Sequence, residues 1–148
     1  MKSIENEIIE CIKTSNDFTY TNLEVVEPYS YKEPDFNKII IVVQEIQNSP
    51  NSNTFTNKEE YSELGYQISI LSRLQRISNE NGEVRNASPY EVTRTMYFEL
   101  VDKLYENFLL TRVGDPIVRP YYADDTVLER VFRVANTMDL EHEYLYRR

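Results

Sequence analysis

The longest regular patterns of apolar and polar residues fall in the middle of the chain. Five consecutive β-branched apolar residues, Ile39 to Val43, are typical of a strand covered on both faces, and we expect that strand to span 38–47. Residues 61–72 alternate between apolar and polar side chains, which is the pattern of a strand with one covered face. The polar segment 48–60 is too long for a two-residue turn, so the sequence predicts a loop that projects from the sheet.

Two further segments repeat apolar residues at helical spacing. The first is N-terminal, and its apolar positions are Ile4, Ile8, Cys11 and Ile12. The second has a clear start, because Ser88 suits an N-cap, Pro89 suits the first helical position and Glu91 completes a capping box. Its pattern continues for about twenty residues and stops near Gly114. The predicted buried stripe comprises Val92, Met96, Leu100, Leu104 and Phe108, broadened by Tyr97, Val101 and Tyr105.

The remaining patterns are extended. Residues 23–27 predict a short strand, and the proline-flanked segment 115–122 predicts a strand at a sheet edge. Residues 126–139 alternate over a long stretch, and 141–148 predict a short final strand or arm. The sequence therefore predicts one α+β domain over 1–148: a mixed, mainly antiparallel β-sheet with an N-terminal helix and one long helix packed on it.

The charge of the chain says more about its function than its composition does. The longest apolar run is five residues, far short of the roughly 20 that span a bilayer, so we expect no transmembrane helix. The acidic, amphipathic N-terminus is unlike a signal peptide. The net charge is -9, and every arginine follows position 72. Because a phosphate-binding protein normally carries a basic face, tight nucleic-acid binding is disfavoured. The charge is either that of an ordinary soluble acidic protein, which we favour, or that of a surface that does not adhere to passing DNA, with its arginines reserved for protein contacts.

Residues that would carry catalysis are scarce. The three glycines are far apart and form no phosphate-binding loop. We interpret the single histidine, His142, as a solvated residue, because strand alternation points the acids beside it to the opposite face. The single cysteine, Cys11, lies on the apolar side of the first helix, so we interpret it as a core residue. A lone cysteine excludes an intrachain disulfide and is consistent with cytosolic synthesis.

Adjacent acids and clustered aromatic residues leave alternatives open. Asp124 and Asp125 are either a turn or a metal-binding pair, and we favour the turn. Tyr29 and Tyr31 lie in a proline-bounded connection that either forms an exposed contact surface or covers the sheet. Phe55 is a large apolar residue in a polar loop, which suggests that another surface covers it. We therefore predict no catalytic, cofactor-binding or metal-ligating residues.

Several residue strings, in order, resemble one known family. These are 38–45 (Lys-Ile-Ile-Ile-Val-Val-Gln-Glu), 56–70 with its Tyr-Ser and Tyr-Gln-Ile groups, the helical segment 101–108, and 125–133. The order of elements and these strings resemble the tail terminator (tail completion) proteins of tailed bacteriophages, over roughly 38–136.

The resemblance implies a structural virion protein that is made in the host cytoplasm and performs no covalent step. Such proteins form a homo-hexameric ring on the head-proximal end of the tail tube. They stop polymerisation of the tube protein and present a docking surface for the head-completion or stopper protein of the neck, while genomic DNA passes through the lumen without specific binding. On this basis the expected interface residues are Phe55, Thr56, Asn57, Arg119, Arg130 and Arg133. Tyr29 and Tyr31 are further interface candidates on their aromatic character alone, because the resemblance does not extend to 28–36.

Two alternative functions stay open. The nearer one is another ring protein of the phage neck, such as a head-completion or stopper protein. The more distant one is a small metal-dependent hydrolase that uses Asp124, Asp125 and neighbouring acids.

Overall fold

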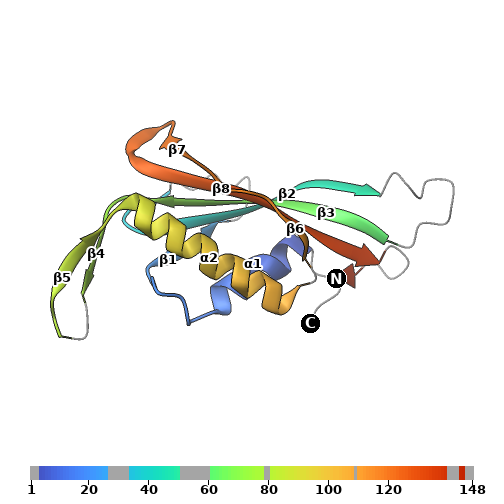
Figure 1. Ribbon diagram of the computed structural model, residues 1–148, viewed down its shortest axis with the longest axis horizontal. Helices are drawn as coiled ribbons and strands as arrows, with labels where there is room; N and C mark the ends of the chain where they lie inside the picture. The colour runs from blue at the N-terminus through green and yellow to red at the C-terminus, as the bar shows by residue number, and fades with distance from the viewer. Residues whose placement is uncertain are drawn as a thin grey trace.

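The computed structural model describes residues 4–26, 34–50, 61–78, 81–108, 110–139 and 144–145. It has the expected α+β architecture, with helices on one side of a long, twisted sheet (Figure 1). In chain order the elements are α1 (Ile4–Thr14), β1 (Leu23–Val26), β2 (Ile39–Pro50), β3 (Tyr61–Ser72), β4 (Gln75–Ser78), β5 (Val84–Ala87), α2 (Pro89–Asn107), β6 (Leu110–Val113), β7 (Ile117–Tyr121), β8 (Asp124–Asp139) and β9 (Tyr144–Leu145).

The main sheet is built around β8. β3 pairs antiparallel with β8 over twelve residues, from Tyr61 opposite Asp139 to Ser72 opposite Leu128. The other edge of β8 pairs with three short strands in succession, β7, β6 and β9. β2 lies antiparallel beside β3, and β1 lies parallel beside the first residues of β2. The sheet is therefore mixed and mainly antiparallel, as predicted.

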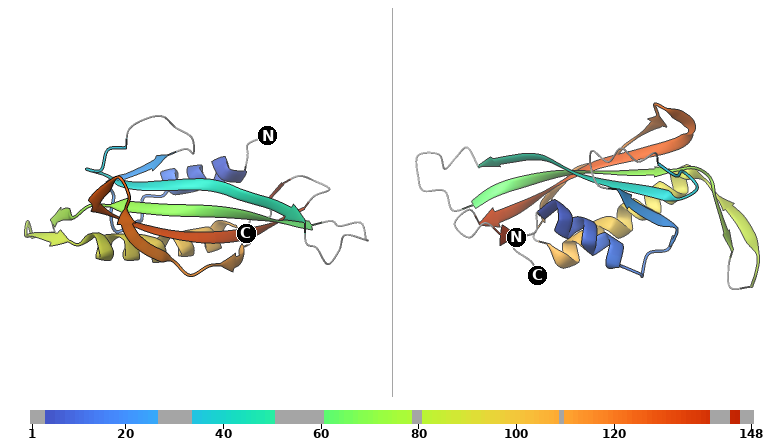
Figure 2. Two further views of the ribbon diagram at one scale, coloured as in Figure 1. Left: turned by 90° about the horizontal axis from the view of Figure 1, so that it is seen from above. Right: turned by 180° about the vertical axis from the view of Figure 1, so that it is seen from behind.

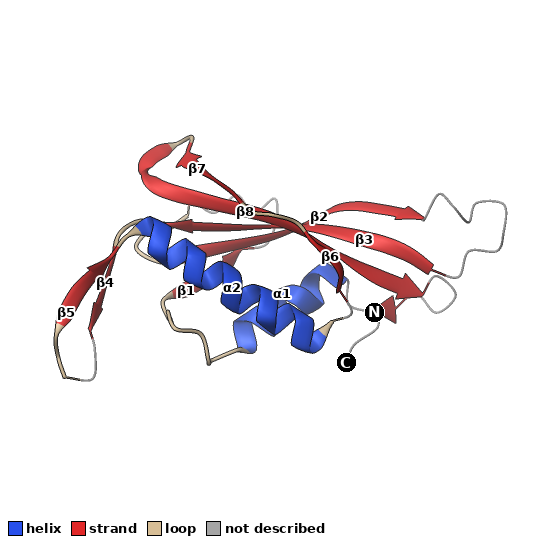
Figure 3. Cartoon of the chain, in the orientation of Figure 1, coloured by secondary structure: helices blue, strands red, loops and turns tan. Residues whose placement is uncertain are grey.

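The main core lies between the sheet and the two helices, which cover the same face (Figure 3). Each strand contributes alternate residues to it, because successive side chains of a strand point to opposite faces. The buried members are Ile39, Ile41 and Val43 of β2, Tyr66, Ile68 and Ile70 of β3, Phe132 and Val134 of β8, Ile8, Ile9 and Ile12 of α1, and Val92, Met96, Leu100 and Leu104 of α2. None of the helices in the described residues is long and apolar enough to cross a membrane.

A smaller cluster lies on the opposite face of the sheet. Ile40, Leu71 and Val127 are buried there, and Phe36 packs edge-on against Tyr121 with their ring centroids 5.5 Å apart. The run of β-branched residues in β2 is thus covered on both faces at this end of the sheet, as its sequence predicted.

The start of α2 also follows the prediction. The Ser88 side chain accepts a hydrogen bond from the backbone N–H of Glu91 at 3.1 Å, and Pro89 occupies the first turn. The Glu91 carboxylate does not close the expected capping box on Ser88. It accepts hydrogen bonds from Arg85 at 3.1 and 3.3 Å instead, which ties β5 to the helix. The helix ends at Asn107, earlier than its sequence pattern suggested, and β6 follows.

The hairpin β4–β5 was not predicted. It projects from one end of the body as a separate two-stranded sheet, with Gly82 in its turn at a φ of 78° (Figures 1 and 2). Its strands have few apolar residues, and only Ile77 and Ala87 pack against the main core. The polar composition of the hairpin hid it from an analysis based on periodicity.

Two buried tyrosines of this core should respond in opposite ways to loss of the hydroxyl. Tyr66 is fully buried, and its hydroxyl oxygen has no hydrogen-bond partner within the described chain. Burial and the nearby Glu45 carboxylate raise its pKa, so the hydroxyl stays neutral. We expect Tyr66→Phe to raise the free energy of unfolding by about 1 kcal/mol, because a desolvated, unpaired group is removed.

Tyr20 is the matched comparison, since its buried side chain shares hydrogen bonds with Thr95 and Arg85. Tyr20→Phe should lower the free energy of unfolding by about 1 kcal/mol. Urea denaturation of both variants measures the two changes. Equal losses of stability in both would show that the Tyr66 hydroxyl has a partner.

Candidate functional site

The face of the sheet opposite the helices is the broadest surface that no helix covers (Figure 2, left). We call it the open face. It is formed by the side chains of β2, β3, β8 and the short edge strands that alternate with the core positions. Its central members are Val42, Gln44, Gln67 and Arg133, together with the buried residues Ser69, Val131 and Ala135, and Arg112 and Arg119 lie at the edge.

Strand register places three polar side chains of the open face in one line. Gln44 of β2 is opposite Gln67 of β3, and Gln67 is opposite Arg133 of β8. Directly paired residues project from the same face of a sheet, about 5 Å apart from strand to strand. The row thus consists of two amides and a guanidinium, none of which is a nucleophile, and Arg133 is its exposed member.

Arg133 is the exposed arginine at the centre of the open face. Arg119 donates from Nε to the Glu129 carboxylate at 2.6 Å, so this pair is neutral. Arg112 lies on the same face opposite Ala135, and Glu24 lies on it opposite Ile40. No carboxylate of the described residues pairs with Arg133. Its guanidinium therefore favours an acidic partner at this position.

Arg130 was expected at an interface, but it lies inside the chain. Arg130 is 4% exposed. Its Nε donates to the Thr93 hydroxyl at 3.2 Å, and its guanidinium carbon lies 4.9 Å from the centre of the Tyr90 ring. The alternation of β8 explains this position, because Arg130 shares the helix-covered face with Phe132. Arg130 therefore fastens the start of α2 to the sheet and is not presented to a neighbouring subunit.

Five other expected interface residues cannot be placed. Tyr29, Tyr31, Phe55, Thr56 and Asn57 all lie outside the described residues. From the connection that contains Tyr29 and Tyr31, the structure describes Phe36, which packs on the sheet. The sequence alone does not predict the polar row of the open face, because its residues become neighbours only through strand register.

Asp124 and Asp125, the two acids considered for metal binding, differ in their contacts. The Asp124 carboxylate accepts hydrogen bonds from the backbone N–H and the hydroxyl of Thr126, at 2.9 and 2.6 Å, and from Arg73. These donors hold the pKa of Asp124 at about 2, below its ordinary value. Asp125 is exposed, and His142 lies outside the described residues. The described chain contains no group of three metal-ligating side chains.

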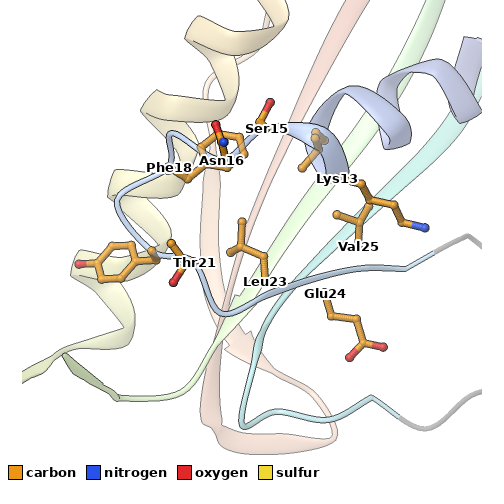
Figure 4. Close-up of a pocket in the computed structure, with 10 residues that line it drawn as sticks. Lys13, Ser15, Asn16, Phe18, Thr21, Leu23, Glu24 and Val25 are labelled. Carbon is orange, nitrogen blue, oxygen red and sulfur yellow. The ribbon is translucent and has the colours of Figure 1, made fainter. Parts of the chain in front are cut away.

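A hollow lies between the end of α1, the connection that follows it and β1. Its volume is about 540 Å³, and Figure 4 shows it between Phe18, Leu23 and Val25 with Lys13 and Glu24 at its margin. Cys11 lies nearby on α1, half-buried against the main core, as predicted.

Comparison with known proteins adds no assignment. No protein-family model matches the chain, and no curated protein matches its sequence significantly.

The two neighbouring arginines of β8 should differ in their effect on stability. Arg130→Ala removes a packed side chain and its bond to Thr93, so we expect the free energy of unfolding to fall by about 2 kcal/mol. Arg133→Ala changes an exposed residue and should alter the free energy of unfolding by less than about 0.5 kcal/mol. Urea denaturation measures both. If the two variants were equally stable, the contacts of Arg130 would not hold the start of α2 on the sheet.

The depressed pKa of Asp124 predicts a pH dependence of stability. Because the folded state favours the carboxylate, its contribution is present above the unfolded pKa near 4 and is lost as the pH falls towards 2. Asp124→Asn should therefore lower the melting temperature at pH 6, and the difference from the native protein should vanish between pH 4 and 2. Asp125→Asn is the control and should melt in parallel with the native protein. A pH-independent difference for Asp124→Asn would contradict this account.

Proposed function

We propose that this chain is a ring-forming structural protein of the tail terminator type. In this proposal it caps the head-proximal end of a phage tail tube, ends polymerisation of the tube protein and offers a docking surface to the neck. It acts through complementary surfaces and performs no covalent step.

One observation carries the proposal. The strings that resemble the tail terminator family lie on β2, β3, the second half of α2 and β8. β8 is distant in sequence from β2 and β3, yet the three are adjacent strands of the sheet, and α2 contacts β3 and β8. The resemblance therefore covers a contiguous structural unit, which supports a shared fold more strongly than scattered strings would.

The strand edges favour ring closure through side chains. In β7 the edge contains Pro120, which has no N–H to offer an incoming strand. On β2 the backbone N–H of Glu45 donates to the Glu5 carboxylate at 2.9 Å, so this donor is already used. A closed ring needs two different surfaces of each subunit to meet. We place the open face, with Arg133 at its centre, in that contact.

The charge of the open face supports this placement over a position in the lumen. A channel lined with Arg133 of every subunit would bind the phosphates of DNA, and release would then be slow. An acidic neighbouring subunit is a better match for Arg133, and the net charge of -9 supplies such surfaces.

The test uses the tube protein of the parent phage. Purified tube protein that polymerises alone should stop growing when this chain is added, with the chain retained on the tubes. Arg133→Glu should reduce retention at least tenfold, because like charges would then face each other. The control is Arg76→Glu on the projecting hairpin, also exposed and off the open face, which should behave as the native protein does. Electron microscopy gives the tube lengths, and sedimentation gives the retained protein.

Two results would contradict the proposal. Tubes that grow equally long with and without the native protein would show that the chain does not cap tubes. Equal retention of Arg133→Glu and Arg76→Glu would show that the open face does not form the ring contact.

A further inference from the structure

The outward face of α2 carries large aromatic side chains where a helix of this kind is normally polar. Tyr90 is 55% exposed, Phe98 is 54% exposed and Tyr105 is 38% exposed. The sequence pattern had placed Tyr105 in the buried stripe, but the buried side of the helix is formed by Val92, Met96, Leu100 and Leu104. Exposed aromatic rings on the outer side of a helix indicate that another surface covers that side.

Charged residues of opposite sign stand on either side of Phe98 along this outer face. Arg94 precedes it by four residues, and its guanidinium lies 5.8 Å from the centre of the Phe98 ring. Asp102 follows it by four residues and is exposed. Neither Arg94 nor Asp102 has an ion-pair partner among the described residues. They cannot pair with each other, because eight residues of helix separate them by about 12 Å.

This spacing makes the outer face complementary to itself. If a second copy of α2 is laid antiparallel on the first with Phe98 on a two-fold axis, Arg94 of each copy faces Asp102 of the other. The same operation brings Tyr90 near Tyr105. Rows of residues four apart are the ridges that interlock when two helices pack. A two-fold contact requires just such a self-complementary patch.

We propose that the outer face of α2 binds a second copy of this chain, in an antiparallel two-fold dimer centred on Phe98. Charge complementarity within one helix selects this partner, since both members of each ion pair are present on every copy. A single pair of helices covers less than the roughly 800 Å² per partner of a standard interface, so the dimer is weak and concentration-dependent. This contact is distinct from the contact that would close a ring, so neither proposal depends on the other.

Charge reversal tests the dimer. Sedimentation equilibrium of the full chain at low salt should show the mass rising from 17.6 kDa towards twice that value as concentration increases. Arg94→Asp alone, or Asp102→Arg alone, should weaken association at least tenfold, because both inter-chain pairs become repulsive. The double variant Arg94→Asp/Asp102→Arg should restore association to within about threefold, since the pairs re-form with their signs exchanged.

The controls separate this contact from others. Arg76→Asp, an exposed charge reversal on the projecting hairpin, should leave association unchanged. Circular dichroism of each variant should match the native protein, because the substituted side chains are exposed. A monomer at every concentration up to 1 mM, on the order of the weakest specific contacts, would overturn the dimer. So would association that survives the single reversals, or that the double variant does not restore.

A cysteine on the axis gives an independent readout. In a Cys11→Ser background, Phe98→Cys places the new thiol of one chain beside the new thiol of the other. Mild oxidation should therefore yield a covalent dimer. Asp102→Cys in the same background is the comparison, because the two copies of that residue lie on opposite sides of the axis. Equal cross-linking of both variants, or none for Phe98→Cys, would contradict the two-fold arrangement.

Discussion

The twelve-residue pairing of β3 with β8 is the constraint on which the rest of the structure depends. It joins the two halves of the chain, and its register decides which side chains of β8 meet the helices and which form the open face. Arg130 and Phe132 fall on the helix side, whereas Arg133 falls on the other. A shift of one residue would exchange these two sets and expose the core side chains of β8.

Local patterns were sufficient to predict the elements that make this pairing. β3 spans the predicted 61–72, and α2 begins at the cap formed by Ser88. β8 begins two residues before the predicted start, because Asp124 binds Thr126 and closes the turn after β7. In each case the apolar period and the capping chemistry agree with the tertiary structure, which is the condition under which sequence patterns are informative.

Features that depend on tertiary contact were not predictable in this way. β6 is four residues long and follows directly on α2, so its pattern merged with that of the helix. Arg130 was expected at an interface because the resemblance implies ring contacts by the closing strand, although its alternation with Phe132 and Val134 places it on the core side. Gln44, Gln67 and Arg133 form a row only because of the register of β2, β3 and β8. No spacing along the chain predicts this row.

Cryo-electron microscopy of tails assembled in the absence of heads tests the proposed capping function most directly. A cap would form a ring of this chain at the head-proximal end of each headless tail. Headless tails that lack the chain, with the chain found on filled heads instead, would contradict the account and assign the protein to the head side of the neck.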